Sequence, residues 1–269
     1  MTERDYILGT HDVEVERLAL QHRVWRSRAL DAWARAGFTA GQTILDVGSG
    51  PGEATLDLAE IVGPEGGVIA IERSRRFLET LRDRTSGRDL RQVRAFELDL
   101  DDDDLPAVAA DGAWARWVFA FVKRPRALLQ KVGEALRPGG RFVSHEYFDY
   151  ATWRLIPRSA ELEDFVRIVM TSWRLEGGEP DIGRDLAMWL PEAGFEIQSI
   201  RPIVEVIRPS DFMWQWPKAF IDSGTQRLVD LGRLSPNDAK ALLDAFTRAG
   251  ESPDTLLVTP AVLEIIAVR

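Results

Sequence analysis

One short stretch near the start of the chain constrains the fold more than any other. Residues 43–47 read TILDV, and three glycines spaced two apart follow at once, Gly48, Gly50 and Gly52. A buried strand that breaks into a glycine turn leaves bare backbone at its carboxyl end, where open α/β sheets bind their ligands. The stretch therefore predicts an α/β domain with a ligand site at this turn.

Strand and helix patterns alternate after the turn. The expected strands are 43–47, 68–72, 93–100, 112–122, 141–147, 195–207 and 255–268, and the expected helices between them include 53–62, 74–84 and one that begins at Pro125. Strands separated by helices imply a doubly wound sheet. We expect a Rossmann-like α/β fold with seven strands, mostly parallel, in which the last strand is antiparallel.

The same patterns predict the domain organisation. Residues 12–36 read as one amphipathic helix, so 1–39 are expected to form an N-terminal helical cover. Residues 40–207 and 255–269 make the main domain. Between them, 208–254 form a helical insertion rich in aromatic residues, which we interpret as a lid or a dimerisation element that would make the protein a homodimer.

Composition excludes several kinds of chemistry. The 269 residues contain no cysteine and three histidines. Disulfides, thiolate metal sites and cysteine nucleophiles are therefore ruled out, and no metal site is expected. The acidic run at 101–104 is interpreted as a solvated loop.

Charge and hydropathy limit the partners. The net charge of −9 argues against a nucleic-acid partner, because phosphate binding needs a basic surface. No apolar run approaches the roughly 20 residues that span a bilayer, and the first residues do not resemble a signal peptide. We therefore expect no membrane partner and a cytoplasmic location.

The glycine turn separates two classes of cofactor. Dinucleotide-binding turns favour a third glycine where this chain has Glu53, and a carboxylate there would face a pyrophosphate. S-adenosylmethionine carries no phosphate but has a sulfonium and an ammonium, so nearby acids are favourable. Asp46, directly before the turn, fits that cofactor better.

The motif ILDVGSGPG at 44–52 resembles the first motif of class I S-adenosylmethionine-dependent methyltransferases of the small-molecule type. Segments 136–140 and 193–195 are similar to that family's entries into the fifth and sixth strands. The resemblance implies that Glu72 holds the ribose hydroxyls and that Asp99, or Asp101 in its place, lies near the adenine. The residues that it assigns to the cofactor are Asp46, Gly48, Ser49, Gly50, Gly52, Glu72, Arg73, Asp99, Leu100, Arg116 and Trp117.

The acceptor should lie at the carboxyl ends of the fourth and fifth strands. Methyl transfer is an in-line displacement, which needs a base only if the acceptor must lose a proton. His145 is the candidate base or a residue that positions the acceptor, with Glu146 or Tyr147 next. The residues expected to line the acceptor pocket are His22, Trp25, Phe119, Tyr147 and Trp153, and Tyr6 is expected to cover the cofactor.

The sequence favours a small, apolar or aromatic metabolite as the acceptor. An NPPY-like motif is absent, and the nine tryptophans suggest an enclosed aromatic pocket. Two alternatives stay open. The chain could bind S-adenosylmethionine without transferring a methyl group, or catalyse another reaction around it. It could also be a nicotinamide-dependent oxidoreductase, which Glu53 disfavours.

Overall fold

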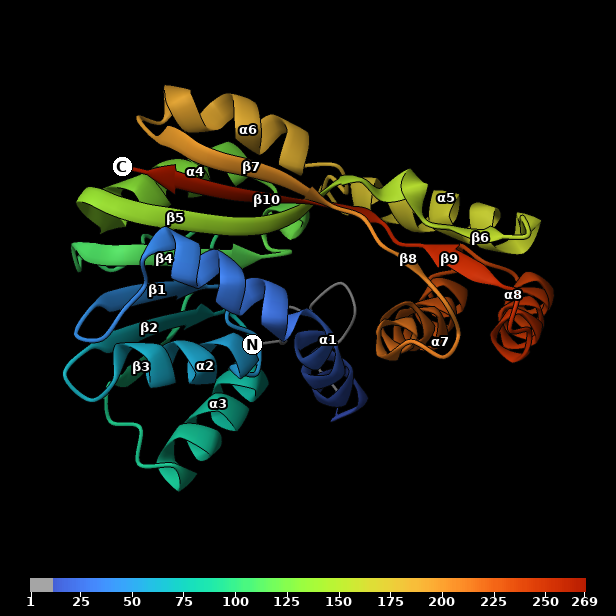
Figure 1. The fold of residues 1–269 in the computed structure, drawn as a ribbon, viewed down its shortest axis with the longest axis horizontal. Coiled ribbons are helices and arrows are strands. Elements are labelled where there is room, and N and C mark those ends of the chain that lie inside the picture. Colours follow the sequence, from blue (N-terminus) through green and yellow to red (C-terminus); the bar gives the residue numbers. More distant parts are fainter. Residues whose placement is uncertain (1–11) are drawn as a thin grey trace.

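The structure, a computed structural model, describes residues 12–269, so Tyr6 and His11 lie outside the described part of the chain. Its main feature is a seven-stranded sheet in the order β3-β2-β1-β4-β5-β10-β7 (Figure 1). The strands are β1 Thr43–Val47, β2 Gly67–Glu72, β3 Val93–Glu97, β4 Ala110–Arg116, β5 Leu136–Asp149, β7 Glu196–Ile203 and β10 Ala261–Val268. Only β10 runs antiparallel to its neighbours, which confirms the predicted fold.

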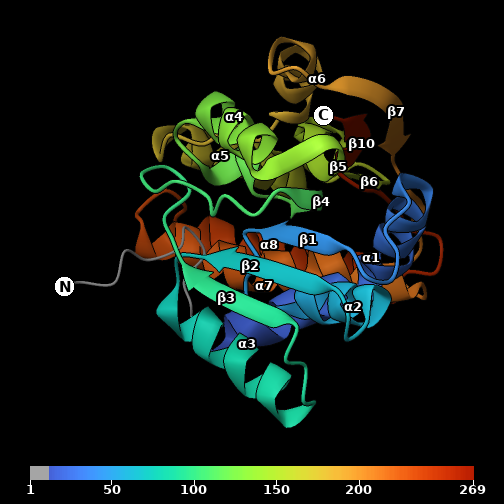
Figure 2. The same ribbon diagram turned by 90° about the vertical axis from the view of Figure 1, so that its left-hand side faces the viewer.

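Helices cover both faces of this sheet. Helices α1 (Asp12–Ala36) and α2 (Glu53–Val62) bury residues such as Trp33 against one face. Helices α4 (Pro125–Ala135) and α6 (Gly183–Glu192) pack on the other. Figure 2 shows α2 and α4 on opposite sides of the sheet. Helix α3 (Arg75–Gly87) begins where Ser74 Oγ accepts a hydrogen bond from the amide of Phe77. Such a doubly wound arrangement leaves the carboxyl ends of the strands free to build a site.

A second, smaller lobe lies beyond those carboxyl ends (Figure 1). It contains the sheet β6-β9-β8 and three helices. Its elements are β6 Arg154–Ile156, β8 Val206–Ile207, β9 Leu256–Val258, α5 Ala160–Leu175, α7 Gln215–Asp230 and α8 Pro236–Glu251. The insertion at 208–254 therefore does not stand alone, because it shares a hydrophobic core with α5 and β6. In the described residues, no helix is long and apolar enough to cross a membrane.

Two predicted strands are each divided between the two lobes. The strand expected at 195–207 becomes β7 and β8, and the one expected at 255–268 becomes β9 and β10. From β7 to β8 the chain passes from the large sheet to the small one, and from β9 to β10 it returns to the large sheet. Apolar residues continue through the crossing, so their pattern alone does not reveal the break.

The fourth strand is shorter than its sequence predicts. It ends at Arg116, and Trp117 then adopts a left-handed conformation with φ of 52°. The carboxylate of Glu146 accepts hydrogen bonds from the amides of Val118 at 2.7 Å and Phe119 at 2.9 Å. These amides therefore bond to a side chain and not to a neighbouring strand. The apolar run at 117–122 forms a turn and a 3-10 helix, η1, at Phe119–Phe121.

Gly112 of β4 lies against the ring of Phe38, and a substitution there tests how closely the two pack. A Cβ atom there would lie 2.4 Å from Cε1 of Phe38, so Gly112→Ala must displace a buried ring. We expect a loss of about 2 kcal/mol in the free energy of unfolding, measured by urea denaturation. Gly87→Ala is the control, because a Cβ at Gly87 meets nothing within 4 Å. Equal stability of the two variants would contradict the packing described.

Candidate active site

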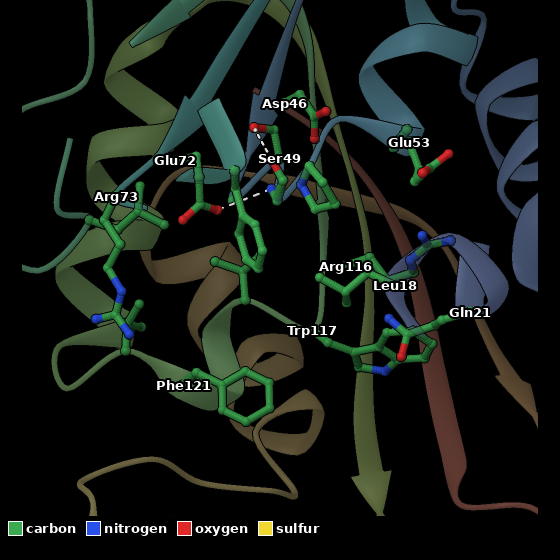
Figure 3. A pocket seen from close by; sticks show the side chains of 18 of the residues that line it. Leu18, Gln21, Asp46, Ser49, Glu53, Glu72, Arg73, Arg116, Trp117 and Phe121 are labelled. Carbon is green, nitrogen blue, oxygen red and sulfur yellow. Dashed lines mark hydrogen bonds between the residues drawn. The ribbon is translucent and has the colours of Figure 1, made fainter. Parts of the chain in front are cut away.

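A large pocket opens at the carboxyl ends of β1, β2, β3 and β4, beneath α1 and the second lobe. It encloses about 1200 Å³ of space, its open mouth included. Figure 3 shows Glu72 and Arg73 on one side of it, and Leu18 and Gln21 on the other.

The glycine turn forms the floor of the pocket. Gly48 has φ of 68°, and a Cβ there would lie 2.6 Å from Cγ2 of Val118. Gly50 has φ of 56°, and a Cβ there would meet only Leu18, 3.9 Å away. A ligand can therefore approach the backbone between the turn and α1. Gly52 is not in the pocket wall, and its missing Cβ lets α2 lie against Leu81 of α3.

Glu72, the last residue of β2, is fixed at one end of the pocket. Its Oε2 accepts a hydrogen bond from the amide of Gly50 at 3.0 Å, and its Oε1 from the amide of Ser74 at 2.8 Å. Burial raises the pKa of Glu72, and these hydrogen bonds partly offset the rise. Each carboxylate oxygen keeps further acceptor capacity. Glu72 can therefore accept hydrogen bonds from a diol in the pocket.

The acidic side chain of Asp46 and the cationic side chain of Arg116 line another part of the wall. Burial raises the pKa of Asp46 to about 6, and Thr55 donates a hydrogen bond of 2.6 Å to its carboxylate. Arg116 lies at the end of β4. Burial lowers its pKa to about 10, and the negative charge of Asp46 offsets part of this decrease. Its guanidinium lies 5.4 Å from the ring centre of Trp117. This pair suits a ligand that carries both an ammonium and a carboxylate.

Asp99 and Asp101 both line the pocket, at the end of β3. The carboxylate of Asp101 accepts hydrogen bonds from the backbone amides of Lys123 and Arg124, each at 2.9 Å. Its own amide donates to Asp99 at 3.0 Å. Since Asp101 holds the loop before α4, Asp99 stays the better candidate for contact with a ligand.

A second part of the pocket wall is formed by α1, by the second lobe, by β5 and by the segment after β4, and we call it the acceptor half. Its residues are Arg17, Leu18, Gln21, Trp117, Phe121, Val122, Tyr147, Trp173 and Phe220. Tyr147 stacks on Trp117 with ring centres 5.3 Å apart, and Trp216 stacks on the other face of Trp117 at 5.6 Å. Most of this surface is aromatic, as the tryptophan content predicts.

The structure does not bring His145 into the pocket. His145 is fully buried, its Nε2 lies 3.2 Å from Glu264, and the rings of Trp25 and Trp114 meet it edge-on. Tyr147 is on the same face of β5 and does reach the pocket. His145 is buried and Tyr147 is not enclosed in the same way, because α1 covers this face of β5 at His145 through Trp25. The prediction that His145 is the catalytic base is therefore corrected.

Glu146 is also absent from the pocket wall. It points to the other face of β5, where its Oε1 binds the turn after β4 and its Oε2 has no partner among the described residues. Burial raises the pKa of Glu146 to about 7. Its observed contacts give it a role in holding the turn and not in acid–base chemistry at an acceptor.

Four of the five residues expected to line the acceptor pocket do not line it. Trp25 is buried, with its ring edge-on to those of Trp117 and Trp216, and Phe119 is enclosed by the core on the α4 side of the sheet. His22 is 4% exposed and contacts Asp57 and Arg116. Trp153 lines a separate small cavity, which Tyr147 and Phe220 divide from the main pocket.

Sequence reasoning missed the contributions of α1 and the second lobe. Arg17 and Gln21 are one turn apart on α1 and both face the pocket. Arg17 donates to Gln21 Oε1 at 3.1 Å and to both oxygens of Glu14 at 2.7 Å. Their four-residue spacing beside Leu18 was the available signal. Nothing in the local pattern of Trp173 or Phe220 distinguishes a pocket residue from a core residue.

Comparison with known proteins agrees with this geometry. Residues 44–140 match the methyltransferase domain family. The chain is 31% identical over 225 residues to an uncharacterised 37.1 kDa protein in transposon TN4556 of Streptomyces fradiae, covering 82% of this chain and 61% of that protein. It is 27% identical over 196 residues to the ubiquinone/menaquinone biosynthesis C-methyltransferase UbiE of Vibrio campbellii, covering 65% of this chain and 71% of UbiE.

The fold is also similar to that of geranyl diphosphate C-methyltransferase from Streptomyces coelicolor A3(2), with a TM-score of 0.60 and 16% identity. That match covers 92% of this chain and 80% of the other. The chain carries a class I S-adenosylmethionine-dependent methyltransferase domain. S-adenosylmethionine is the cofactor of this domain.

The residues at the pocket fit that cofactor. Asp46 and Glu53 would supply carboxylates for an ammonium, Arg116 would supply a cation for a carboxylate, and Glu72 would supply acceptors for a ribose diol. Because Gly48 and Gly50 have no side chains, the cofactor can lie against the turn. When bound, S-adenosylmethionine supplies an electrophilic methyl group on its sulfonium.

Proposed function

We propose that this protein is a methyltransferase that moves the methyl group of S-adenosylmethionine to a small, apolar or aromatic metabolite. The observation that carries the proposal is the division of one pocket into two unlike halves. Charged residues and bare backbone line the cofactor half, and aromatic side chains line the acceptor half. Such a pocket orients two molecules and excludes water, which is most of what an in-line displacement requires.

The acceptor half limits the nucleophile. Among its described lining residues there is no carboxylate or imidazole, and its charged group is the guanidinium of Arg17. An arginine does not act as a base at physiological pH. We therefore propose an acceptor that attacks without losing a proton to the protein, such as an ionised phenol, an enolate or a neutral amine. The aromatic side chains of the acceptor half would pack against its ring.

Two measurements test this function. Isothermal titration calorimetry should show binding of S-adenosylhomocysteine and no comparable binding of NAD. Incubation with S-adenosylmethionine and a panel of naphthols, hydroquinones and aromatic amines should release S-adenosylhomocysteine for at least one compound. Tight binding of NAD without S-adenosylhomocysteine binding would contradict the proposal. Cofactor binding without turnover on any oxygen, nitrogen or carbon acceptor would favour a protein that no longer transfers methyl groups.

A further inference from the structure

A chain of polar side chains connects α1 with α2 and with the pocket wall. Asp57 of α2 accepts hydrogen bonds from Arg26 at 2.8 and 3.0 Å. Its Oδ2 lies 3.0 Å from Nε2 of His22, and Nδ1 of His22 lies 3.0 Å from Nη2 of Arg116. We call Arg26, Asp57, His22 and Arg116 the α1 relay. It runs from the half-exposed Arg26 to Arg116 in the pocket wall.

The chemistry of the partners fixes the state of His22. An arginine only donates hydrogen bonds, so Nδ1 of His22 must accept from Arg116. Nδ1 therefore carries no proton, and Nε2–H donates to Asp57. His22 is the neutral Nε2–H tautomer in this arrangement. It cannot accept a proton at Nδ1 without losing the contact with Arg116.

Several charged groups face His22. Arg116 of β4 and Arg26 of α1 are cations, while Asp57 and Glu53 of α2 are acids. Burial lowers the pKa of His22 below its usual 6.5, Arg116 lowers it further, and Asp57 and Glu53 act in the opposite direction. Neutral His22 therefore favours the folded state above pH 6.5. That contribution is lost as the pH falls through the lowered pKa.

We infer that His22 is a positioning residue, which holds the guanidinium of Arg116 where it meets the methionine carboxylate of the cofactor. The inference rests on the proposed function, because it needs a cofactor at Arg116. His22 approaches from α1, Asp57 from α2 and Arg116 from β4, so the contact forms only when α1 lies over the sheet. His22 thereby contributes to cofactor affinity although it does not line the pocket itself.

Binding of two probes tests the inference. S-adenosylhomocysteine contains the methionine-derived carboxylate, whereas 5′-methylthioadenosine lacks it. We expect His22→Ala to weaken S-adenosylhomocysteine binding about tenfold, the cost of misplacing a charged hydrogen-bond donor, and to leave 5′-methylthioadenosine binding unchanged. His22→Gln should restore affinity, because its amide can accept from Arg116 and donate to Asp57. Arg23→Ala is the control, since Arg23 is exposed on the same helix.

Nitrogen NMR gives a readout that does not depend on the ligand. The chain has three histidines, and His22→Gln identifies the signals of His22 by their loss. Without ligand, His22 should show a protonated Nε2 and an unprotonated Nδ1 at pH 7.5. Affinity for S-adenosylhomocysteine should fall in the wild type as the pH is lowered through the depressed pKa of His22, and less so in His22→Gln.

The outcomes distinguish failure of the role of His22 from failure of the proposed function. If the wild type binds S-adenosylhomocysteine but His22→Ala weakens neither probe, or both equally, the positioning role is wrong and the proposed function stands. A protonated Nδ1 on His22 would also overturn the role. If the wild type does not bind S-adenosylhomocysteine, the proposed function fails and the role of His22 fails with it.

Discussion

Glu72→Ala should weaken the binding of S-adenosylhomocysteine about 100-fold. The carboxylate of Glu72 accepts a hydrogen bond from the amide of Gly50, and we expect it to accept hydrogen bonds from the ribose diol of the cofactor. Its removal leaves these donors without an acceptor, and each stranded group costs about 1–3 kcal/mol. Calorimetric titration at pH 7.5 measures the change directly.

Glu97→Ala is the matched control for Glu72→Ala. Glu97 ends β3 and pairs in register with Glu72 on β2, but its carboxylate is largely exposed and pairs with Arg75. An effect within twofold is expected for this variant, because exposed ion pairs contribute little. If Glu72→Ala also binds within twofold of the wild type, the ribose assignment is wrong. Circular dichroism of both variants verifies that the fold is kept.

The cofactor half of the pocket could be predicted from the sequence because its geometry is local. Asp46, Gly48 and Gly50 lie within five residues of each other along one strand and turn, so their spacing fixes their relative positions. Glu72 ends the next strand, and parallel strands bring their carboxyl ends to one edge. Gly52 was assigned to the same surface, but its role is to admit Leu81.

The acceptor half could not be predicted because it depends on contacts between distant segments. The strand pattern places His145 and Tyr147 on one face of β5, and this is correct. Only the packing of Trp25 against His145 shows that one is buried and the other lines the pocket. Likewise, the sequence pattern predicts Trp117 as a strand residue. In the structure the strand ends before it, because the carboxylate of Glu146 accepts hydrogen bonds from the next two backbone amides.

The role of Glu146 leads to the second large prediction. Glu146→Ala should lower the free energy of unfolding by about 3 kcal/mol, because the buried amides of Val118 and Phe119 lose their acceptor. The turn also holds Trp117 in a left-handed conformation, which costs about 1–2 kcal/mol for a residue with a side chain. Glu146→Gln should be far less harmful, because the amide oxygen can still accept both hydrogen bonds.

The pH dependence of stability distinguishes the carboxyl group from its amide replacement. Burial raises the pKa of Glu146 from the model-compound value of 4.5 to about 7, so the unfolded chain binds fewer protons than the folded one between these values. Stability from this group is complete below pH 4.5 and is lost as the pH rises through 7. At about 1.4 kcal/mol per pH unit, the wild type should lose about 2 kcal/mol relative to Glu146→Gln between pH 5.5 and 8.5.

Urea denaturation of the wild type and Glu146→Gln at several pH values measures this difference. Asp46 also has a raised pKa, but it titrates in both proteins and cancels in the comparison. A constant difference between the two proteins over this range would show that Glu146 is ionised throughout in the folded state. In that case the two amides, and not burial, would determine its charge, and the turn that carries Arg116 and Trp117 would be held by a carboxylate anion.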